Sequence, residues 1–249
     1  RDESRRSVKS IEKASHGGGT WYLNRYHGAQ CDSESHVYCY SFNDDLLEEW
    51  QWSERYPSQP EVLEYLRFAA DELDLREDIE FETEVTSAAF DEAGGQWTIS
   101  TDDGSQVTSQ FFVTAVGCLS EPWVPDFDGI DSFEGEAYHT GRWPHDSVDF
   151  TDKKVAVIGT GATGIQIIPE IAQRDVTDLT VFQRTPNYAV PARDRSLDDE
   201  AWDEIQKNYD DILEAAHSSG FGHPFEAAYE TAEDRPMEEV ADILEPRWQ

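Results

Sequence analysis

The chain has 249 residues, a length that suggests one or two domains. It carries 53 acidic and 19 basic side chains, for a formal net charge of −34 at pH 7. Such an acidic surface repels nucleic acid and anionic membranes, so we expect neither as a partner. Hydrophobic residues make up 38% of the chain, enough to build cores and to argue against intrinsic disorder. No apolar run approaches the roughly 18 residues that span a bilayer, and no signal peptide opens the chain.

The cysteines and the distribution of charge bear on the compartment. Cys31, Cys39 and Cys118 are odd in number and lack metal-ligand spacing, which predicts no metal site and a reducing, cytoplasmic location. The acidic residues are scattered along the chain rather than gathered in a tail. This pattern favours adaptation to a cytoplasm of high salt, where dissolved ions screen the repulsion between the acidic side chains. The alternative is an acidic protein from an ordinary cytoplasm.

The first half of the chain mixes short strands with one amphipathic helix. Residues 7–12 predict a short strand, which a glycine run and an aromatic stretch follow. Ser58-Gln-Pro-Glu61 predicts a capping box that opens a helix running to about residue 73. Val85–Phe90 and Trp97–Thr101, separated by turn signals, predict a β-meander. Residues 111–116 are apolar throughout and predict a buried strand of a parallel sheet.

A proline-rich linker over residues 122–144 leads to a second unit. Its pattern predicts a β-α-β unit: a buried strand Val155–Ile158, a glycine loop Gly159–Gly164, a helix Ile165–Ala172 and a strand Leu179–Phe182. Beyond Pro191 the chain becomes acidic and helical. We expect a capping box at Ser196-Leu-Asp-Asp199, a break at 220–224 and a final helix near 236–244.

The glycine loop is the strongest chemical signal. Gly159, Gly161 and Gly164 form a G-x-G-x-x-G motif between a strand and a helix. The first glycine permits the tight turn, the second lets the backbone approach a pyrophosphate, and the third permits close packing of helix and strand. The motif alone is weak, because glycine turns are common, but this context favours a dinucleotide site.

The end of the next strand indicates which dinucleotide would bind. An acidic residue there would hold a free ribose 2′-hydroxyl, whereas this chain has Gln183-Arg184-Thr185. The guanidinium of Arg184 suits a 2′-phosphate, so NADPH is preferred over NADH. The alternative is a solvated surface arginine. In the first half, Glu12 has the position of a ribose-binding acid at a strand end, although taken alone it reads as an exposed acid.

Several longer motifs resemble one family. Gly18-Gly-Thr-Trp-Tyr-Leu-Asn-Arg-Tyr-His-Gly-Ala-Gln-Cys-Asp32, continuing to Phe42, resembles the flavin-side motif of Baeyer–Villiger monooxygenases. Residues 133–144 fit that family's F-x-G-x-x-x-H-x-x-x-W-P fingerprint, and its Trp-Pro ending favours this group over N-hydroxylating and sulfur-oxidising flavin monooxygenases. Residues 58–61, 115–122 and 183–193 match as well. The resemblance covers nearly the whole chain from about residue 7.

The resemblance implies an α/β fold with two Rossmann-like, three-layer nucleotide-binding domains, both incomplete. Residues 1–145 would form part of an FAD-binding domain with a β-meander insertion. Residues 146–249 would form part of an NADPH-binding domain, with a helical insertion from about residue 192. The implied reaction uses NADPH, FAD and dioxygen to insert one oxygen atom next to a ketone carbonyl, giving an ester or lactone.

The resemblance also implies roles for individual residues. The flavin side would comprise Glu12, Gly18, Gly19, Thr20, Trp21 and Asp32. NADPH would be held by Gly159, Thr160, Gly161, Thr163, Gly164, Arg184 and Thr185. Asp32, His139 and Trp143 would be catalytic, Asp32 by tuning an arginine and the other two by coupling the linker to NADPH binding. Without the resemblance, Asp32 reads as a turn carboxylate, Trp21 and Trp143 as core aromatics, and His139 as a satisfied loop histidine.

The chain also departs from the family pattern. The strand and glycine loop that would anchor the FAD diphosphate do not precede Glu12, and the family's catalytic arginine would lie beyond Gln249. We therefore expect a fragment, one product of a split gene whose remainder is a separate chain, or a degraded gene. The alternative function is a catalytically silent NADPH-binding module. His27 replaces a proline and frees a turn, Gln30 replaces an arginine near Asp32, and Val116 replaces a small hydroxyl residue.

Overall fold

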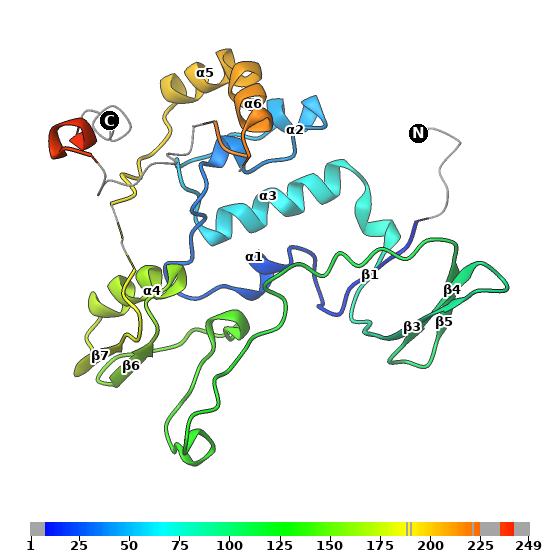
Figure 1. The fold of residues 1–249 in the computed structure, drawn as a ribbon, viewed down its shortest axis with the longest axis horizontal. Coiled ribbons are helices and arrows are strands. Elements are labelled where there is room, and N and C mark those ends of the chain that lie inside the picture. The colour runs from blue at the N-terminus through cyan, green and yellow to red at the C-terminus, as the bar shows by residue number, and fades with distance from the viewer. Residues whose placement is uncertain (1–7, 188, 190, 221, 225–234, 242–249) are drawn as a thin grey trace.

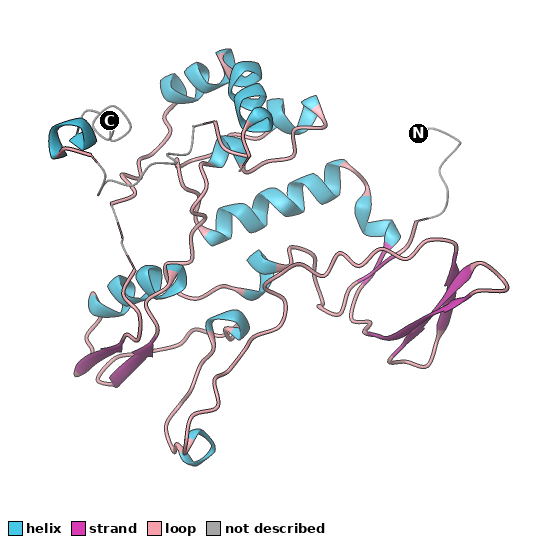
Figure 2. Ribbon diagram, in the orientation of Figure 1, coloured by secondary structure: helices cyan, strands magenta, loops and turns pink. Residues whose placement is uncertain are grey.

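The computed structural model describes residues 8–187, 189, 191–220, 222–224 and 235–241. Within them the fold is mixed α/β, with three small sheets at the periphery and helices between them (Figures 1 and 2). The strands are β1 (Ser10–Ile11), β2 (Ile79–Glu80), β3 (Val85–Asp91), β4 (Gln96–Thr101), β5 (Gln106–Ser109), β6 (Lys154–Ile158) and β7 (Asp178–Phe182). The α-helices are α1 (Thr20–Leu23), α2 (Asp44–Glu49), α3 (Gln59–Glu72), α4 (Ala162–Ala172), α5 (Asp199–Lys207) and α6 (Tyr209–Ser218).

Helix α3 lies at the centre of the molecule (Figure 1). It begins where the sequence predicts, with Ser58 at the N-cap and a proline in the first turn, and it buries Val62, Tyr65 and Ala69. The capping box is wrong, because the Ser58 side chain makes no cap hydrogen bond. The Glu61 carboxylate instead accepts a hydrogen bond of 2.7 Å from the backbone N–H of Ser53, in the preceding loop.

The predicted β-meander is confirmed. β4 pairs antiparallel with β3 on one side and with β5 on the other, and register shifts between Val85 and Ser87. This sheet lies on the opposite side of the molecule from the β6–β7 sheet (Figure 1).

The strand predicted over residues 111–116 is wrong. The segment is a loop, and Phe111, Val113 and Val116 are 65%, 81% and 71% exposed. A strand needs a neighbour to receive its backbone hydrogen bonds. None of the described strands pairs with this segment. The linker that follows is irregular, as predicted, apart from the short 3-10 turns η3 (Ile130–Ser132) and η4 (Thr140–Arg142).

The predicted β-α-β unit is present. β6 and β7 pair in parallel from Lys154 with Asp178 to Ile158 with Phe182, and α4 connects them. The expectation of a buried β6 is only half met, because alternate residues face outward and Ile158 is 66% exposed. The described part of this sheet holds only two strands, which leaves one of its faces and both of its edges largely uncovered.

The helical segment after residue 191 is confirmed, but its cap is not Ser196. The Asp198 carboxylate accepts from the backbone N–H of Ala201 at 2.9 Å, so α5 begins at Asp199. Ser196 instead forms an antiparallel bridge with Glu54. Of the final predicted helix, residues 237–241 are helical and residues 242–244 lie outside the described residues.

Two clusters of buried side chains organise the molecule. The aromatic core joins α3 to the segment that leads into α5, and consists of Cys31, Trp52, Val62, Tyr65, Leu197 and Trp202. The linker core joins α4 to the segments before and after η4, and consists of Tyr26, Ala29, Trp143, Val148, Phe150, Ile167 and Ile171. Helices α5 and α6 therefore pack beside α2 and α3 rather than on the β6–β7 sheet (Figure 1).

Candidate functional site

The glycine loop has the geometry that a dinucleotide site requires. Gly159 follows β6 with a φ of 104°, a turn conformation that L side chains rarely adopt. A Cβ on Gly164 would lie 2.5 Å from the carbonyl oxygen of Gly159, so the third glycine permits helix and loop to approach closely. A Cβ on Gly161, at the N-cap of α4, would meet nothing within 4 Å. The loop is thus tight at its first and third glycines and open at its second, which is the N-cap of α4.

The residues after β7 lie next to this loop. The Gln183 side-chain amide donates to the Thr160 hydroxyl at 2.7 Å, which ties the end of β7 to the glycine loop. Arg184 and Thr185 follow directly and are both exposed. The Arg184 side chain is therefore accessible to solvent just beyond the end of β7.

The flavin-side candidates lie along α1 and the loops around it. Gly18 has a φ of 120°, and a Cβ there would lie 2.5 Å from Leu63 Cδ1. Gly19 is the N-cap of α1, with open space around it, and Thr20 is half-buried as the first residue of that helix. The Trp21 indole N–H donates to the Tyr38 hydroxyl at 2.9 Å. The two rings meet edge to face, which holds this tryptophan beside the aromatic core.

The Glu12 side chain forms a hydrogen bond within its own turn. Its carboxylate accepts from the backbone N–H of Ala14 at 2.7 Å, and its backbone N–H donates to Glu80 at 2.9 Å. In this structure Glu12 is a strand-end acid that closes a turn.

Asp32 is exposed, and its negative charge affects the pKa of neighbouring side chains, among them Tyr26 and Cys31. Burial, and then the Asp32 carboxylate, raise the pKa of Tyr26, and the Thr163 side chain acts the other way. Burial raises the pKa of the Cys31 thiol to about 11, and the charge of Asp32 contributes to that rise. Tyr26 thus lies within reach of both the Asp32 carboxylate and Thr163 of the glycine loop.

Gln166 connects the glycine-loop helix to the loop that carries Asp32. Its side-chain oxygen accepts from the Tyr26 hydroxyl at 2.7 Å, and its amide donates to the Gln30 carbonyl at 2.9 Å. A Cβ on Gly28 would lie 2.7 Å from the backbone oxygen of Gln166, so loop and helix are in direct contact. The sequence did not single out Gln166, although a glutamine between two isoleucines of α4 was the signal.

The two fingerprint residues of the linker have different environments. Trp143 is buried in the linker core and contacts the rings of Tyr138, His27 and Phe150. His139 Nδ1 accepts from the backbone N–H of Gly141 at 3.0 Å, and its Nε2 lies 3.3 Å from the Trp123 carbonyl oxygen. Trp143 shares its cluster with Tyr26, so the linker touches the same residue that Asp32 and the glycine loop approach.

The expectation that His27 frees its turn is wrong. One ring nitrogen lies 3.1 Å from the Arg174 guanidinium and the other 3.4 Å from the Val148 carbonyl oxygen. The ring also packs edge-on against Trp143 and Phe150. His27 is therefore fixed by contacts that a proline could not make.

No described helix has the length and apolar character that crossing a membrane requires. No group of three or more His, Cys, Asp or Glu side chains within the described ranges could hold a metal ion.

Comparison with known proteins defines the class. The family model described as FMO-like, flavin-binding monooxygenase-like, matches residues 11–190. The chain belongs to this family of enzymes.

Individual relatives and a solved structure show which members of this family the chain resembles. The chain is 46% identical over 227 residues to the acetone monooxygenase (methyl acetate-forming) of Gordonia sp., covering 90% of this chain and 42% of that protein. It is 44% identical over 249 residues to a Baeyer-Villiger monooxygenase of Pseudooceanicola batsensis, covering 100% of this chain and 45% of that protein. The crystal structure of OTEMO complexed with FAD and NADP matches with a TM-score of 0.89 and 41% identity, over 97% of this chain and 46% of that chain. The chain thus spans less than half the length of these relatives.

Proposed function

We propose that this chain belongs to an FAD- and NADPH-dependent monooxygenase of Baeyer–Villiger type. Such an enzyme inserts one oxygen atom of dioxygen next to a ketone carbonyl and gives an ester or lactone. The observation that carries the proposal is the contact of α4, behind the glycine loop, with the loop that bears Asp32. The hydrogen bonds of Gln166 to Tyr26 and Gln30 make that contact.

The glycine loop fits NADPH. The backbone is open at Gly161, so a pyrophosphate can approach the N-terminus of α4, an 11-residue helix whose dipole favours negative charge. Thr160 and Thr163 would supply hydroxyl groups from the loop and the first turn of α4, and Thr185 from the chain after β7. Arg184 would pair with the 2′-phosphate, which would distinguish NADPH from NADH.

The flavin side fits its cofactor in part. Gly19 has open space where a ring or ribose could approach, and Gly18, Thr20 and Trp21 flank it. Glu12 would need to exchange its contact with Ala14 for a ribose hydroxyl. FAD, when bound, would supply the chemistry that activates dioxygen, and NADPH the hydride.

The chain's own residues would position these groups. Asp32, being exposed and next to Tyr26, would place a negative charge where the two nucleotide-binding parts meet. Trp143 would transmit the position of the linker to α4 through the linker core, and His139 would hold the 3-10 turn before it. We propose the division between the two parts at residues 145 and 146, directly after this linker.

The experiment measures NADPH and NADH binding by fluorescence titration of the wild type and of Arg184→Gln. We expect the substitution to weaken NADPH binding by about tenfold or more and to leave NADH binding unchanged, since only NADPH carries the 2′-phosphate. Arg67→Gln is the matched control, because Arg67 is an exposed arginine on α3. Equal losses for both nucleotides, or no loss, would contradict the role of Arg184.

The second candidate function is an NADPH-binding module without turnover. The hydrogen bond of the Glu12 carboxylate to the Ala14 N–H favours it, since the flavin side then fits its cofactor only in part whereas the glycine loop fits NADPH. NADPH oxidation, measured with added FAD and with acetone as the ketone, separates the two. Ketone-dependent oxidation supports the monooxygenase, whereas binding without oxidation supports the module or one half of a split enzyme.

A further inference from the structure

Two hydrogen bonds join the first residues of the glycine loop to the end of β7. The backbone N–H of Gly159 donates to the Phe182 carbonyl at 2.9 Å, which continues the parallel pairing of β6 with β7. The Gln183 side-chain amide donates to the Thr160 hydroxyl at 2.7 Å. The backbone thus holds the loop against β7 without Gln183. What the side-chain bond adds is a fixed orientation of the Thr160 hydroxyl.

The bond between Gln183 and Thr160 contributes little to folding. Gln183 is exposed and Thr160 is half-buried, so water can take the place of either partner. Hydrogen bonds of this kind exchange water for protein with a small net gain in stability. A role in ligand binding therefore explains this bond better than a role in holding the fold.

The direction of the bond decides what the Thr160 hydroxyl can do. The nitrogen of an amide only donates, so the hydroxyl oxygen accepts from Gln183 and keeps its own hydrogen for another acceptor. Within the residues that the structure describes, this hydroxyl makes no second hydrogen bond. Gln183 therefore makes Thr160 a hydrogen-bond donor, whose hydrogen points away from the amide.

Thr160 comes directly before the N-terminus of α4. The next residue, Gly161, is the N-cap of this helix, forms no side-chain cap hydrogen bond and has open space around it. The first backbone N–H groups of α4 and the Thr160 hydroxyl are thus donors from one short segment. An anion with several oxygen atoms, such as a pyrophosphate, can accept from all of them.

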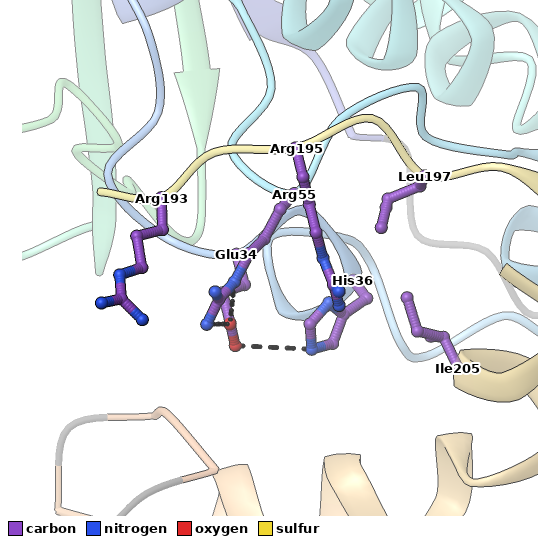
Figure 3. A pocket seen from close by; sticks show the side chains of 7 residues that line it. All are labelled: Glu34, His36, Arg55, Arg193, Arg195, Leu197 and Ile205. Atoms are coloured by element: carbon purple, nitrogen blue, oxygen red, sulfur yellow. Dashed lines mark hydrogen bonds and ion pairs between the residues drawn. The ribbon is translucent and has the colours of Figure 1, made fainter. Parts of the chain in front are cut away.

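Two basic side chains elsewhere in the molecule are, by contrast, engaged by a carboxylate of the chain. In the cavity beside η1 (Ser35–Val37), the Arg55 guanidinium lies 2.6 Å from the Glu34 carboxylate, and His36 Nε2 lies 3.5 Å from the same carboxylate (Figure 3). An anion that approached Arg55 or His36 would have to compete with Glu34. The Thr160 hydroxyl has no such competitor among the described residues.

We propose that Gln183 is a positioning residue of the dinucleotide site. It holds the Thr160 hydroxyl as a donor to the pyrophosphate, a group that NADPH and NADH share. This inference rests on the proposed function, because it requires the glycine loop to bind a dinucleotide. It differs from the role of Arg184, which concerns the 2′-phosphate that only NADPH carries.

The experiment titrates NADPH and NADH separately into the wild type and into variants of Gln183. All titrations use one fixed salt concentration, because the net charge of −34 repels both nucleotides in a salt-dependent way. Gln183→Glu replaces the donating amide by a carboxylate, which only accepts and so takes up the Thr160 hydrogen. We expect Gln183→Glu to weaken both nucleotides by similar factors of about tenfold. Gln183→Met, which cannot form the hydrogen bond, should weaken both by about two- to fivefold.

A double-mutant cycle separates positioning from a merely structural role. Thr160→Val removes the hydroxyl and keeps the shape of the side chain. If Gln183 acts through that hydroxyl, adding Gln183→Met to Thr160→Val should change binding by less than about 1.5-fold. A full additional loss in the double variant would overturn the proposal, because Gln183 would then act by another route.

Gln106→Glu is the matched control. The exposed Gln106 amide donates to the half-buried Ser100 hydroxyl at 3.2 Å, in the meander on the opposite side of the molecule (Figure 1). This substitution adds the same charge to the same kind of pair and should change both affinities by less than about twofold. Urea unfolding of each variant verifies that the fold is kept.

The possible outcomes distinguish this inference from the proposed function. If Gln183→Glu binds both nucleotides as Gln106→Glu does, while Arg184→Gln still weakens NADPH alone, only the role of Gln183 is overturned. A loss in Gln183→Glu that is confined to NADPH would also overturn it, since the new carboxylate would then act on Arg184 rather than on Thr160. If the wild type binds neither nucleotide, the dinucleotide site itself is wrong, and the role of Gln183 falls with it.

Discussion

The aromatic core and the β6–α4–β7 unit both contain large apolar side chains but differ in how much of them is buried. In the aromatic core, Trp52 and Tyr65 are 1% and 2% exposed, and their ring centroids lie 4.9 Å apart. In the β6–α4–β7 unit, Ile158 and Phe182 are 66% and 55% exposed. The first region finds its packing partners within the described chain. The second buries one side of α4 in the linker core and packs Val155, Val157 and Leu179 against that core only in part.

The difference shows what each region requires. The aromatic core is buried by packing between side chains of a helix, a loop and the segment that leads into α5, all of which are present. A parallel sheet with apolar residues on both faces needs further strands or helices on each side. The glycine loop can therefore have the correct local geometry while the sheet behind it stays partly uncovered.

The sharpest test of this comparison removes one large ring from each region. Trp52→Ala should destabilise the protein by about 3–5 kcal/mol, because it leaves a cavity beside Tyr65 and Trp50. Phe182→Ala should cost less than about 1 kcal/mol, since more than half of that side chain already faces solvent. Urea unfolding followed by tryptophan fluorescence and by circular dichroism measures both. Similar costs for the two substitutions would mean that Phe182 is covered in solution.

The same contrast explains how far the sequence predicts this structure. The β-α-β unit and the meander were predictable because their periodicity and glycines act locally, over a few residues. Residues 111–116 were not, since an apolar run becomes a strand only beside a partner strand. The cap at Asp198 was missed because Ser196, two residues earlier, is also a good cap, and only the pairing with Glu54 decides between them.

The candidate site shows the same limit. The roles of the glycines followed from the motif, because backbone conformation and close approach are local requirements. The contact of Gln166 with Tyr26 and Gln30 joins residues more than 130 positions apart, and no local pattern encodes such a pairing. His27 was misjudged for this reason too, since Arg174 and Val148 hold it from a distant part of the chain.

Substitutions at two glycines of the loop distinguish an effect on stability from an effect on NADPH binding. Gly164→Ala should cost about 1–3 kcal/mol of stability, because its Cβ would lie 2.5 Å from the Gly159 oxygen and backbone must shift. Gly161→Ala should change stability by less than about 0.5 kcal/mol, since its φ is −74° and nothing lies within 4 Å. Gly161→Ala should nevertheless weaken NADPH binding, because the added methyl group occupies the approach to the pyrophosphate. If Gly161→Ala binds NADPH as the wild type does, the open space there is not the phosphate site.

The smallest expected effect concerns protonation next to the aromatic core. Burial is the main cause that lowers the pKa of His36 below its usual 6.5, and Arg55 acts in the same direction while Glu34 opposes it. Below pH 6.5 the unfolded chain therefore binds a proton that the folded chain does not, and this histidine makes stability fall as pH decreases toward its folded-state pKa.

His36→Gln should accordingly show a shallower loss of stability than the wild type between pH 7.5 and about pH 5.5, measured by urea unfolding. His217→Gln, which removes an exposed histidine on α6, serves as the control and should follow the wild type. Because the acidic background is common to all three proteins, the difference between their slopes isolates the buried ring. Identical slopes of stability against pH for His36→Gln and the wild type would mean that folding does not lower the pKa of His36.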